Sequence, residues 1–342
     1  MDALIGYKES VNTIAKEIPI KDGSFLITGA TGLVGSCIVD TLVAANNEGA
    51  HFKVYAMSRS KGRIEKRFGN KVISVIQDVV DPLENVDHYD YILHCASNAD
   101  PITYVSNPVE TILTNVLGNK AVLDYCKQNL NTRLLLTSTF EVYGQIPEIA
   151  VYNEDMSGVI DQTILRNGYP ESKRVSELLL KSYVNEYNVN ALIARLPSVY
   201  GPTMRDSDLK AHAQFIKKAL KHEDIILKSE GKQRRTYCYL IDAVSAIFKI
   251  LFDGNKGEIY NVSNENSVAS VAEVAKICAE IAKTKVIFES LNKIEQEAFS
   301  KPQDCILDNT KLKKLGWNAR YTLERGLKET ISSYEDCRMY IK

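Results

Sequence analysis

The sequence lacks an excess of charge of either sign. Its 342 residues carry 42 lysines and arginines against 43 aspartates and glutamates, and the cations are spread along the chain. A nucleic-acid-binding surface is expected to show a concentrated basic patch, so we expect no nucleic-acid partner. A small anionic ligand needs only one or two well-placed cations, and this composition is compatible with one.

Paired cysteines, long apolar runs and an apolar leader are also missing. The seven cysteines are widely spaced, with no Cys-x-x-Cys pair and no cysteine–histidine cluster of zinc-binding spacing, so we expect free thiols and no metal site. The longest apolar stretch, residues 25–39, is short of the about 20 residues that a membrane span needs. The first residues carry charges where a signal peptide is apolar. These absences predict a cytoplasmic protein with no membrane partner.

Short apolar runs alternate with helical segments over the first two hundred residues. Residues 1–20 are expected to form an amphipathic helix with an apolar side of Ile5, Val11, Ile14 and Ala15. Strands are expected at 25–27, 54–57, 72–76, 91–95, 133–137 and 191–196, and helices at about 32–46, 108–129 and 168–187. Near-continuous apolar strands separated by helices are typical of a parallel sheet covered on both faces. The pattern therefore predicts an α/β protein with a doubly wound, Rossmann-type sheet.

This alternation ends at Pro197 and again at Gly201-Pro202. Helices at about 208–221, 269–282 and 322–335 follow, with short strands, charged loops and a return to the sheet near 239–250. A chain of 342 residues is too long to fold around a single small hydrophobic core. We predict a dinucleotide-binding domain of residues 1–197 plus about 236–262. A smaller α/β substrate domain then comprises about 198–235 plus 263–342.

A glycine-rich turn directly follows the first predicted strand and opens a helix. A phosphate can approach the backbone closely only where side chains are absent, and the helix N-terminus behind the turn supplies free N–H groups and partial positive charge. The turn therefore predicts a dinucleotide site. Its residues are Gly29, Thr31, Gly32, Leu33, Val34 and Gly35.

The end of the second predicted strand bears on the choice between NAD and NADP. An NAD enzyme usually carries an acid there, which binds the ribose 2′-hydroxyl. This chain has Ser58 and Arg59 instead, with Arg63 one helical step further on. Arginine suits a 2′-phosphate, so the sequence favours NADP, although solvent-exposed arginines with no ligand are common.

Tyr169 and Lys173 lie four residues apart and face the same side of a predicted helix. Tyrosine, with a pKa near 10, is a poor base at neutral pH. A neighbouring ammonium favours the phenolate and can also hold the nicotinamide ribose. Tyr-x-x-x-Lys is a weak motif alone, but its place after the fifth strand favours a catalytic pair.

Several further motifs are spread over nearly the whole chain. These motifs are residues 94–118, 137–144, 195–202, 233–242 and Leu315-Gly316-Trp317. With the Gly-x-x-Gly-x-x-Gly spacing, they make the chain resemble the extended short-chain dehydrogenase/reductases, and among these the NAD(P)-dependent nucleotide-sugar epimerase/dehydratase family. Within that family the region from Ala96-Ser97 to Thr114-Asn115 is most similar to UDP-glucuronate decarboxylases.

The resemblance implies a set of roles. Tyr169 would take a proton from a sugar hydroxyl at C4 as hydride passes to NAD(P), with Thr139 binding the same oxygen and Glu141 acting at C5. Further cofactor contacts would come from Asp78 and Val79 at the adenine, and from Ala96, Ser97, Asn115, Thr137 and Pro197. Substrate contacts would come from Asn98, Ser198, Arg205, Lys210 and Arg235, the last on the diphosphate. A homodimer through the helices at 108–129 and 168–187 is also implied.

Three departures leave the exact reaction open. Phe140 occupies the place of the general-acid Asp of dehydratases, Ser198 replaces an Asn, and Thr203 replaces an Arg for which Arg205 is a candidate substitute. Decarboxylation or epimerisation of a nucleotide sugar is the leading hypothesis. A 4,6-dehydratase, an NADP-dependent reductase or dehydrogenase with net redox change, and a non-catalytic nucleotide-binding protein are the alternatives.

Overall fold

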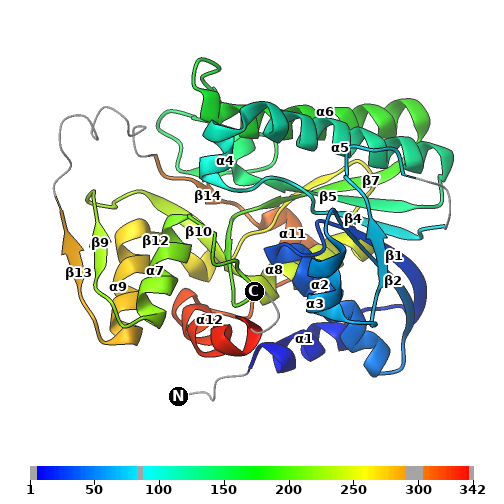
Figure 1. Ribbon diagram of the computed structural model, residues 1–342. Coiled ribbons are helices and arrows are strands. Elements are labelled where there is room, and N and C mark those ends of the chain that lie inside the picture. Colours follow the sequence, from blue (N-terminus) through cyan, green and yellow to red (C-terminus); the bar gives the residue numbers. More distant parts are fainter. Residues whose placement is uncertain (1–5, 84–87, 290–302, 339–342) are drawn as a thin grey trace.

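A seven-stranded sheet forms the centre of the computed structural model, which describes residues 6–83, 88–289 and 303–338. The strand order is β11-β7-β5-β4-β1-β2-β3, and every pair is parallel (Figure 1). The strands are β1 (Asp22–Thr28), β2 (His51–Ser58), β3 (Ile73–Ile76), β4 (Tyr91–His94), β5 (Arg133–Thr139), β7 (Asn190–Leu196) and β11 (Ile259–Asn261). The predicted doubly wound α/β class is confirmed, and each of the six predicted strands is present.

Helices cover both faces of this sheet. Figure 1 shows α5 and α6 along one face and α2 and α8 on the other. The helices of this part are α1 (Tyr7–Lys16), α2 (Leu33–Asn47), α3 (Lys61–Phe68), α4 (Pro101–Ser106), α5 (Pro108–Gln128), α6 (Gly168–Tyr187) and α8 (Leu240–Asp253). The leading helix is shorter than predicted but buries Val11, Ile14 and Ala15 as expected, and Ile5 lies outside the described residues.

Alternating side chains explain why each strand is apolar along its whole length. In β1, Phe25 and Ile27 join the core shared with α2 and α8, whereas Leu26 joins the core on the α5 and α6 face. Strand side chains point to opposite faces in turn, and here both faces are covered.

The second half of the chain adds smaller sheets beside the main one. They are a three-stranded sheet of order β12-β10-β8 and two pairs, β13-β9 and β14-β6. Their strands are β6 (Val151–Tyr152), β8 (Ser198–Tyr200), β9 (Ile225–Leu227), β10 (Arg234–Tyr239), β12 (Val268–Ser270), β13 (Val286–Phe288) and β14 (Ile306–Leu307). The helices are α7 (Ala211–Leu220), α9 (Val271–Ala282), α11 (Thr310–Lys314) and α12 (Leu323–Arg338), with short 3₁₀ turns η1 (Phe140–Tyr143), η2 (Leu165–Asn167) and η3 (Glu265–Ser267).

Local capping sets the start of α9. The Ser270 hydroxyl accepts a hydrogen bond from the Glu273 backbone N–H at 3.2 Å, and the Glu273 carboxylate accepts one from the Ser270 N–H at 2.6 Å. This capping box ties up two N–H groups that the helix itself cannot satisfy. The predicted helix at 269–282 therefore begins at Val271.

The chain returns to the main sheet as predicted, through α8 and the edge strand β11, which pairs with β7. The division into residues 1–197 plus 236–262 and 198–235 plus 263–342 remains a proposal. In the described part of the chain, no helix is both long enough and apolar enough to cross a membrane.

The sheet order places a crevice above β1 and β4. These neighbouring strands lead into helices on opposite faces, α2 after β1 and the α4–α5 pair after β4. In open α/β sheets, ligands bind at such a point, beyond the carboxyl ends of the strands. The predicted site residues lie at this edge.

Candidate active site

The glycine turn after β1 has no room for a side chain at two of its glycines. Gly29 has φ +65°, and a Cβ there would lie 2.8 Å from the backbone of Ala96. A Cβ on Gly35 would lie 2.4 Å from the Gly29 carbonyl oxygen. The glycines therefore bring β1, the start of α2 and the loop after β4 into direct backbone contact.

The start of α2 is free to bind an anion. Gly32 is its N-cap residue, and no side chain caps the helix there. The first N–H groups of a helix have no partner within it and carry partial positive charge. Cradle and uncapped helix together fit the pyrophosphate of a dinucleotide. Of the residues predicted for this role, Gly29, Gly32, Leu33, Val34 and Gly35 line the large pocket described below.

Thr31 contacts a residue from the second half of the chain. The Arg205 guanidinium donates to the Thr31 carbonyl oxygen at 3.1 Å and lies 3.4 Å from its hydroxyl. Arg205 was predicted on the substrate side, but the structure places it against the glycine turn, and it does not line the large pocket. Thr203, in the position of the missing Arg, is buried and donates its hydroxyl to the Leu33 carbonyl at 3.1 Å.

The predicted adenosine side lies at the ends of β2 and β3. Arg59 contacts two acids there, Glu110 at 3.2 Å and Asp78 at 3.7 Å. These carboxylates already neutralise Arg59, which makes it a weaker candidate for a phosphate than the sequence suggested. Ser58 accepts a hydrogen bond from the Ser60 N–H at 3.3 Å.

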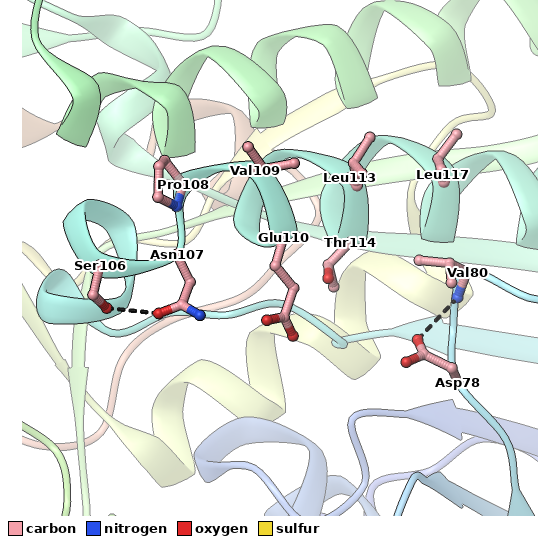
Figure 2. Close-up of a pocket in the computed structure, with 10 residues that line it drawn as sticks. All are labelled: Asp78, Val80, Ser106, Asn107, Pro108, Val109, Glu110, Leu113, Thr114 and Leu117. Carbon is pink, nitrogen blue, oxygen red and sulfur yellow. Dashed lines mark hydrogen bonds between the residues drawn. The ribbon is translucent and has the colours of Figure 1, made fainter.

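Asp78 borders a hollow of about 560 Å³ at the N-terminal half of α5. Figure 2 shows Glu110 on the same side of α5 as Asp78, whereas Val109 and Leu113 project from the other side. Val79, predicted beside Asp78 at the adenine, is buried, and a Cβ on Gly118 would lie 2.9 Å from it. Its neighbour Val80 lines the hollow instead.

A larger pocket of about 630 Å³ opens beyond the carboxyl ends of the strands. It joins the glycine turn to the predicted catalytic residues and continues between the main sheet and the second half of the chain. Among the residues that line it are Ser97, Thr137, Thr139, Glu141, Tyr169, Lys173, Pro197, Ser198, Lys210 and Arg235, all predicted from the sequence. The fold thus brings together residues from six separate segments.

Tyr169 and Lys173 are both buried on the first turns of α6. The Lys173 ammonium donates to the Thr137 carbonyl at 3.1 Å, and burial lowers its pKa to about 8. Thr139 ends β5 beside Tyr169 and accepts a hydrogen bond from the Glu141 N–H at 3.3 Å.

Burial and neighbouring charges set the acidity of Tyr169. Its pKa is raised above the ordinary value of 10, mainly by burial and then by the charge of Glu141. Hydrogen bonding to Thr139 and Tyr104 and the charge of Arg166 act in the opposite direction. In the protein alone, desolvation of the phenolate therefore outweighs the neighbouring groups that favour it.

Two neighbours of Tyr169 were not identified from the sequence. The ring of Tyr104, from α4, stacks on the Tyr169 ring with centroids 4.2 Å apart and planes 9° apart. The Arg166 guanidinium lies 5.7 Å from the Tyr104 ring centre and forms an ion pair with Glu141 at 2.8 Å. The only sequence signal was position, since Arg166 lies three residues before Tyr169.

Ser138 is a third residue that the motif analysis did not select. It lines the large pocket, is 4% exposed, and its hydroxyl has no hydrogen-bond partner among the described residues. Buried hydroxyls are normally paired, so this one is available to a ligand.

Some of the predicted substrate residues lie at the pocket and others do not. Ser198, Lys210 and Arg235 line the pocket, and the Arg235 guanidinium lies 5.7 Å from the centre of the Phe140 ring. Lys210 is 3.8 Å from the Asp208 carboxylate. Asn98 does not line the pocket.

Asn115 is a linking residue rather than a pocket wall. It is buried on α5, accepts a hydrogen bond from the Ser97 hydroxyl at 2.8 Å, and donates one to Ser172 on α6 at 2.9 Å. It holds Ser97 at the pocket edge. Ala96 forms the wall of the glycine turn and donates its N–H to the Thr28 hydroxyl at 3.1 Å.

The fold and the order of these motifs agree with one known family. Residues 25–263 match the model of the NAD dependent epimerase/dehydratase family. The chain belongs to this family. The expected resemblance to the extended short-chain dehydrogenase/reductases is confirmed, and with it the expectation of an NAD(P)-dependent enzyme.

Characterised relatives refine the comparison. UDP-glucuronic acid decarboxylase 6 of Arabidopsis thaliana is 33% identical over 304 residues, covering 88% of this chain and 86% of that protein. UDP-glucuronic acid decarboxylase 1 of Danio rerio is 32% identical over 311 residues, covering 90% and 72%. The predicted similarity to this group is confirmed.

Solved structures agree on the fold. The UDP-glucose 4-epimerase of Thermotoga maritima, with UDP-glucose, has a TM-score of 0.79 at 24% identity and covers 92% of this chain and 99% of its own. The UDP-glucuronic acid 4-epimerase of Bacillus cereus, with UDP-glucuronic acid and NAD, has a TM-score of 0.76 at 19% identity, covering 92% and 99%.

Proposed function

We propose that this protein converts a nucleotide sugar by oxidising its C4 hydroxyl, with UDP-glucuronate decarboxylation as the leading reaction. The observation that carries the proposal is the single pocket in which the glycine cradle, Tyr169, Lys173 and Glu141 all meet. The decarboxylase relatives, at up to 33% identity along most of the chain, support the choice of sugar.

Tyr169 acts as the base in this scheme. Its phenolate takes the proton of the C4 hydroxyl, and the Thr139 hydroxyl holds the same oxygen in place. Lys173, with its pKa lowered to about 8 by burial, supports the phenolate from the same side of α6. When bound, the nicotinamide accepts a hydride from the sugar carbon and can return it.

The residues around Glu141 determine the fate of the C4 ketone. A C5 carboxylate beside a C4 ketone is a β-keto acid and loses carbon dioxide, and a C5 proton beside the same ketone is acidic enough for a carboxylate such as Glu141 to remove. Elimination across C5 and C6 additionally needs an acid to protonate the leaving hydroxyl. Phe140 offers no such proton, so we place 4,6-dehydration below decarboxylation and epimerisation.

A net reductase or dehydrogenase is the second candidate. The observation that favours it is the end of β2. Ser58 stands there in place of an acid, and Arg63 lies in the first turn of α3, the helix that follows. Such a site suits NADP, which commonly serves net reductions. The finer cofactor choice, NADP over NAD, belongs to this proposal.

We also propose a homodimer formed through α5 and α6. Large apolar side chains are exposed on this surface, which is unusual for a helix pair without a partner. They are Ile102, Val105, Val109, Ile112, Leu113 and Leu117 on α4 and α5, and Val175 and Leu178 on α6. Light scattering should give the mass of two chains, and Leu113→Glu should reduce it to one; a single-chain mass for the unaltered protein would contradict the dimer.

A cytoplasmic location is proposed on the cysteines. None of the seven forms a disulfide in the structure, and four of them lie on buried helical or strand positions of the two main cores. Free buried thiols suit a reducing compartment.

Mass spectrometry of products from UDP-, GDP-, CDP- and dTDP-sugars, each with NAD and with NADP, tests the function. The proposal expects UDP-glucuronate to lose carbon dioxide with no net change in nicotinamide absorbance. A lasting absorbance change would favour the second candidate. Cofactor binding without turnover of any sugar nucleotide would instead support a non-catalytic role.

A further inference from the structure

An ion pair lies at the catalytic end of the large pocket, and the proposed mechanism uses only its acidic member. Glu141 is the only acid among the described residues that line the pocket, and Arg166 forms an ion pair with it at 2.8 Å. The Glu141 side chain is 19% exposed and the Arg166 side chain is 43% exposed. Arg166 is therefore a partly solvated cation beside the group proposed to act at C5 of the sugar.

Hydrogen bonds fix the two short turns that carry this pair. Arg166 lies in η2, where the Asn167 side-chain amide donates to the Asp161 carbonyl at 2.8 Å. Glu141 lies in η1, and Arg174 of α6 donates to two carbonyl groups of that turn, at 2.6 and 3.2 Å. The backbone that carries each charged group is thus held by its neighbours.

Arg166 has donors left for a ligand. Its ion pair with Glu141 is made through Nη2, and its guanidinium lies 5.7 Å from the centre of the Tyr104 ring. It forms no other hydrogen bond or ion pair within the part of the chain that the structure describes. A guanidinium has five N–H donors in a planar fork, and a carboxylate can accept from two of them at once. A second carboxylate can therefore bind beside Glu141.

The position of Arg166 matches the substituent at C5 of the sugar. The Tyr104 ring near Arg166 also stacks on the Tyr169 ring at 4.2 Å, so Arg166, Glu141 and Tyr169 share one corner of the pocket. In a pyranose ring, C5 is bonded to C4. With the C4 oxygen at Tyr169 and C5 at Glu141, the C5 substituent lies in the corner that contains Arg166.

A carboxylate in this corner needs a cation. It would repel the Glu141 carboxylate, and the repulsion grows as the bound sugar displaces water. Arg166 forms an ion pair with Glu141, and none of the other described lysines and arginines of the pocket does; these are Lys173, Lys210, Lys228 and Arg235. A neutral hexose brings no charge, and the Glu141–Arg166 pair is already balanced without one.

We propose that Arg166 binds the C5 carboxylate of a hexuronate substrate and so selects nucleotide hexuronates over neutral nucleotide hexoses. Glu141 stays bound to the same guanidinium. The assignment rests on the proposed function and deepens it, because it names the residue that recognises the acid group of the substrate.

Binding of sugar nucleotides to the full-length protein tests the assignment. Every variant carries Tyr169→Phe to slow turnover, and calorimetry in the presence of NAD gives the dissociation constants of UDP-glucuronate, UDP-glucose and UDP-xylose. These ligands carry a carboxylate, a hydroxymethyl group and no substituent at C5. The variants are Arg166→Gln and Arg166→Lys. Arg320→Gln is the matched control, since Arg320 also pairs with one acid, Glu17, and lies outside the pocket.

The protein with Arg166 intact should bind UDP-glucuronate about tenfold or more tightly than the two neutral sugars. Arg166→Gln should abolish this preference by weakening UDP-glucuronate about tenfold or more, as for the loss of hydrogen bonds to a charged group. Arg166→Lys should recover part of the preference, and Arg320→Gln should leave it unchanged. Equal weakening of all three ligands, or a preference that survives Arg166→Gln, would overturn the assignment.

A Glu141→Gln background separates a direct contact from an effect through Glu141. Without the acidic neighbour, the preference for UDP-glucuronate should persist or increase, and adding Arg166→Gln should still abolish it. If Arg166→Gln has no effect in this background, Arg166 acts only by neutralising Glu141, and the carboxylate contact is wrong.

The outcomes separate this assignment from the proposed function. If the unaltered protein releases carbon dioxide from UDP-glucuronate but Arg166→Gln keeps the preference, only the role of Arg166 is wrong. If the protein neither binds nor converts a nucleotide hexuronate, the proposed decarboxylation is wrong as well. Thermal melting of each variant shows whether a loss of binding reflects a loss of folding.

Discussion

The stacked pair of Tyr104 and Tyr169 leads to a quantitative prediction. Tyr169 lies in the first turn of α6, and the parallel ring of Tyr104 at 4.2 Å restricts where its hydroxyl can point. Such aromatic pairs contribute about 0.5–1.5 kcal/mol beyond the area they bury. If that energy positions the base in the transition state, Tyr104→Leu should lower the maximal kcat by roughly twofold to twelvefold.

Two variants make this prediction specific. Tyr104→Phe keeps the ring and should retain maximal kcat within about twofold. Loss of its hydroxyl removes one of the groups that lower the pKa of Tyr169, so the acid limb of the pH profile should move to higher pH. Tyr91→Leu is the matched control, because Tyr91 stacks on Phe25 with centroids 4.7 Å apart and lies outside the pocket.

The assay is kcat and KM against pH, together with the dissociation constant of the cofactor and the melting temperature. A Tyr104→Leu enzyme with unchanged kcat would refute the positioning role. Equal losses in Tyr104→Leu and Tyr104→Phe would show that the hydroxyl matters and the stack does not.

Three further predictions concern the glycine turn, the unpaired hydroxyl and a buried histidine. Gly35→Ala places a Cβ 2.4 Å from a backbone oxygen and should weaken dinucleotide binding at least about tenfold, whereas Gly62→Ala, with open space around it, should leave binding unchanged; equal binding by both would show that the turn does not hold the cofactor. Ser138→Ala removes a hydroxyl with no protein partner, so stability should not fall, while kcat/KM should drop by about twofold to tenfold; unchanged kcat/KM would remove Ser138 from the site. Burial lowers the pKa of His94 from 6.5 to about 3. Between these pH values the His94 imidazole is protonated in the unfolded chain and neutral in the folded chain, so the stability of the fold falls as pH falls from 6.5 toward 3. Urea unfolding is measured at about pH 7.5 and about pH 5. Between these values the unaltered protein and His51→Gln should each lose about 2 kcal/mol more stability than His94→Gln loses; identical pH slopes in all three would contradict a neutral buried His94.

Sequence periodicity and motif order predicted the sheet, the glycine turn and Tyr169 with Lys173, because each of these is encoded within a few neighbouring residues. The stacking of Tyr104 on Tyr169 and the ion pair of Arg166 with Glu141 were not predictable in this way. They depend on how α4, η1 and η2 pack against α6, and no spacing along the chain reports that packing.

Arg59 and Arg205 show the same limit for charged side chains. Both were assigned a ligand-binding role from their place in a motif. The contacts of a long charged side chain, however, depend on which groups the tertiary structure places near it. Asp78 and Glu110 pair with Arg59, and the Thr31 carbonyl accepts from Arg205. The acidity of Tyr169 likewise depends on its burial, which the Tyr-x-x-x-Lys spacing does not specify.

Turnover by Tyr169→Phe is the most direct test of the central claim that Tyr169 is the base for sugar oxidation. With the sugar nucleotide that the unaltered enzyme converts, the variant should lose about a hundredfold or more in kcat, while its dissociation constant for the cofactor stays unchanged. Turnover at the rate of the unaltered enzyme would contradict the mechanism.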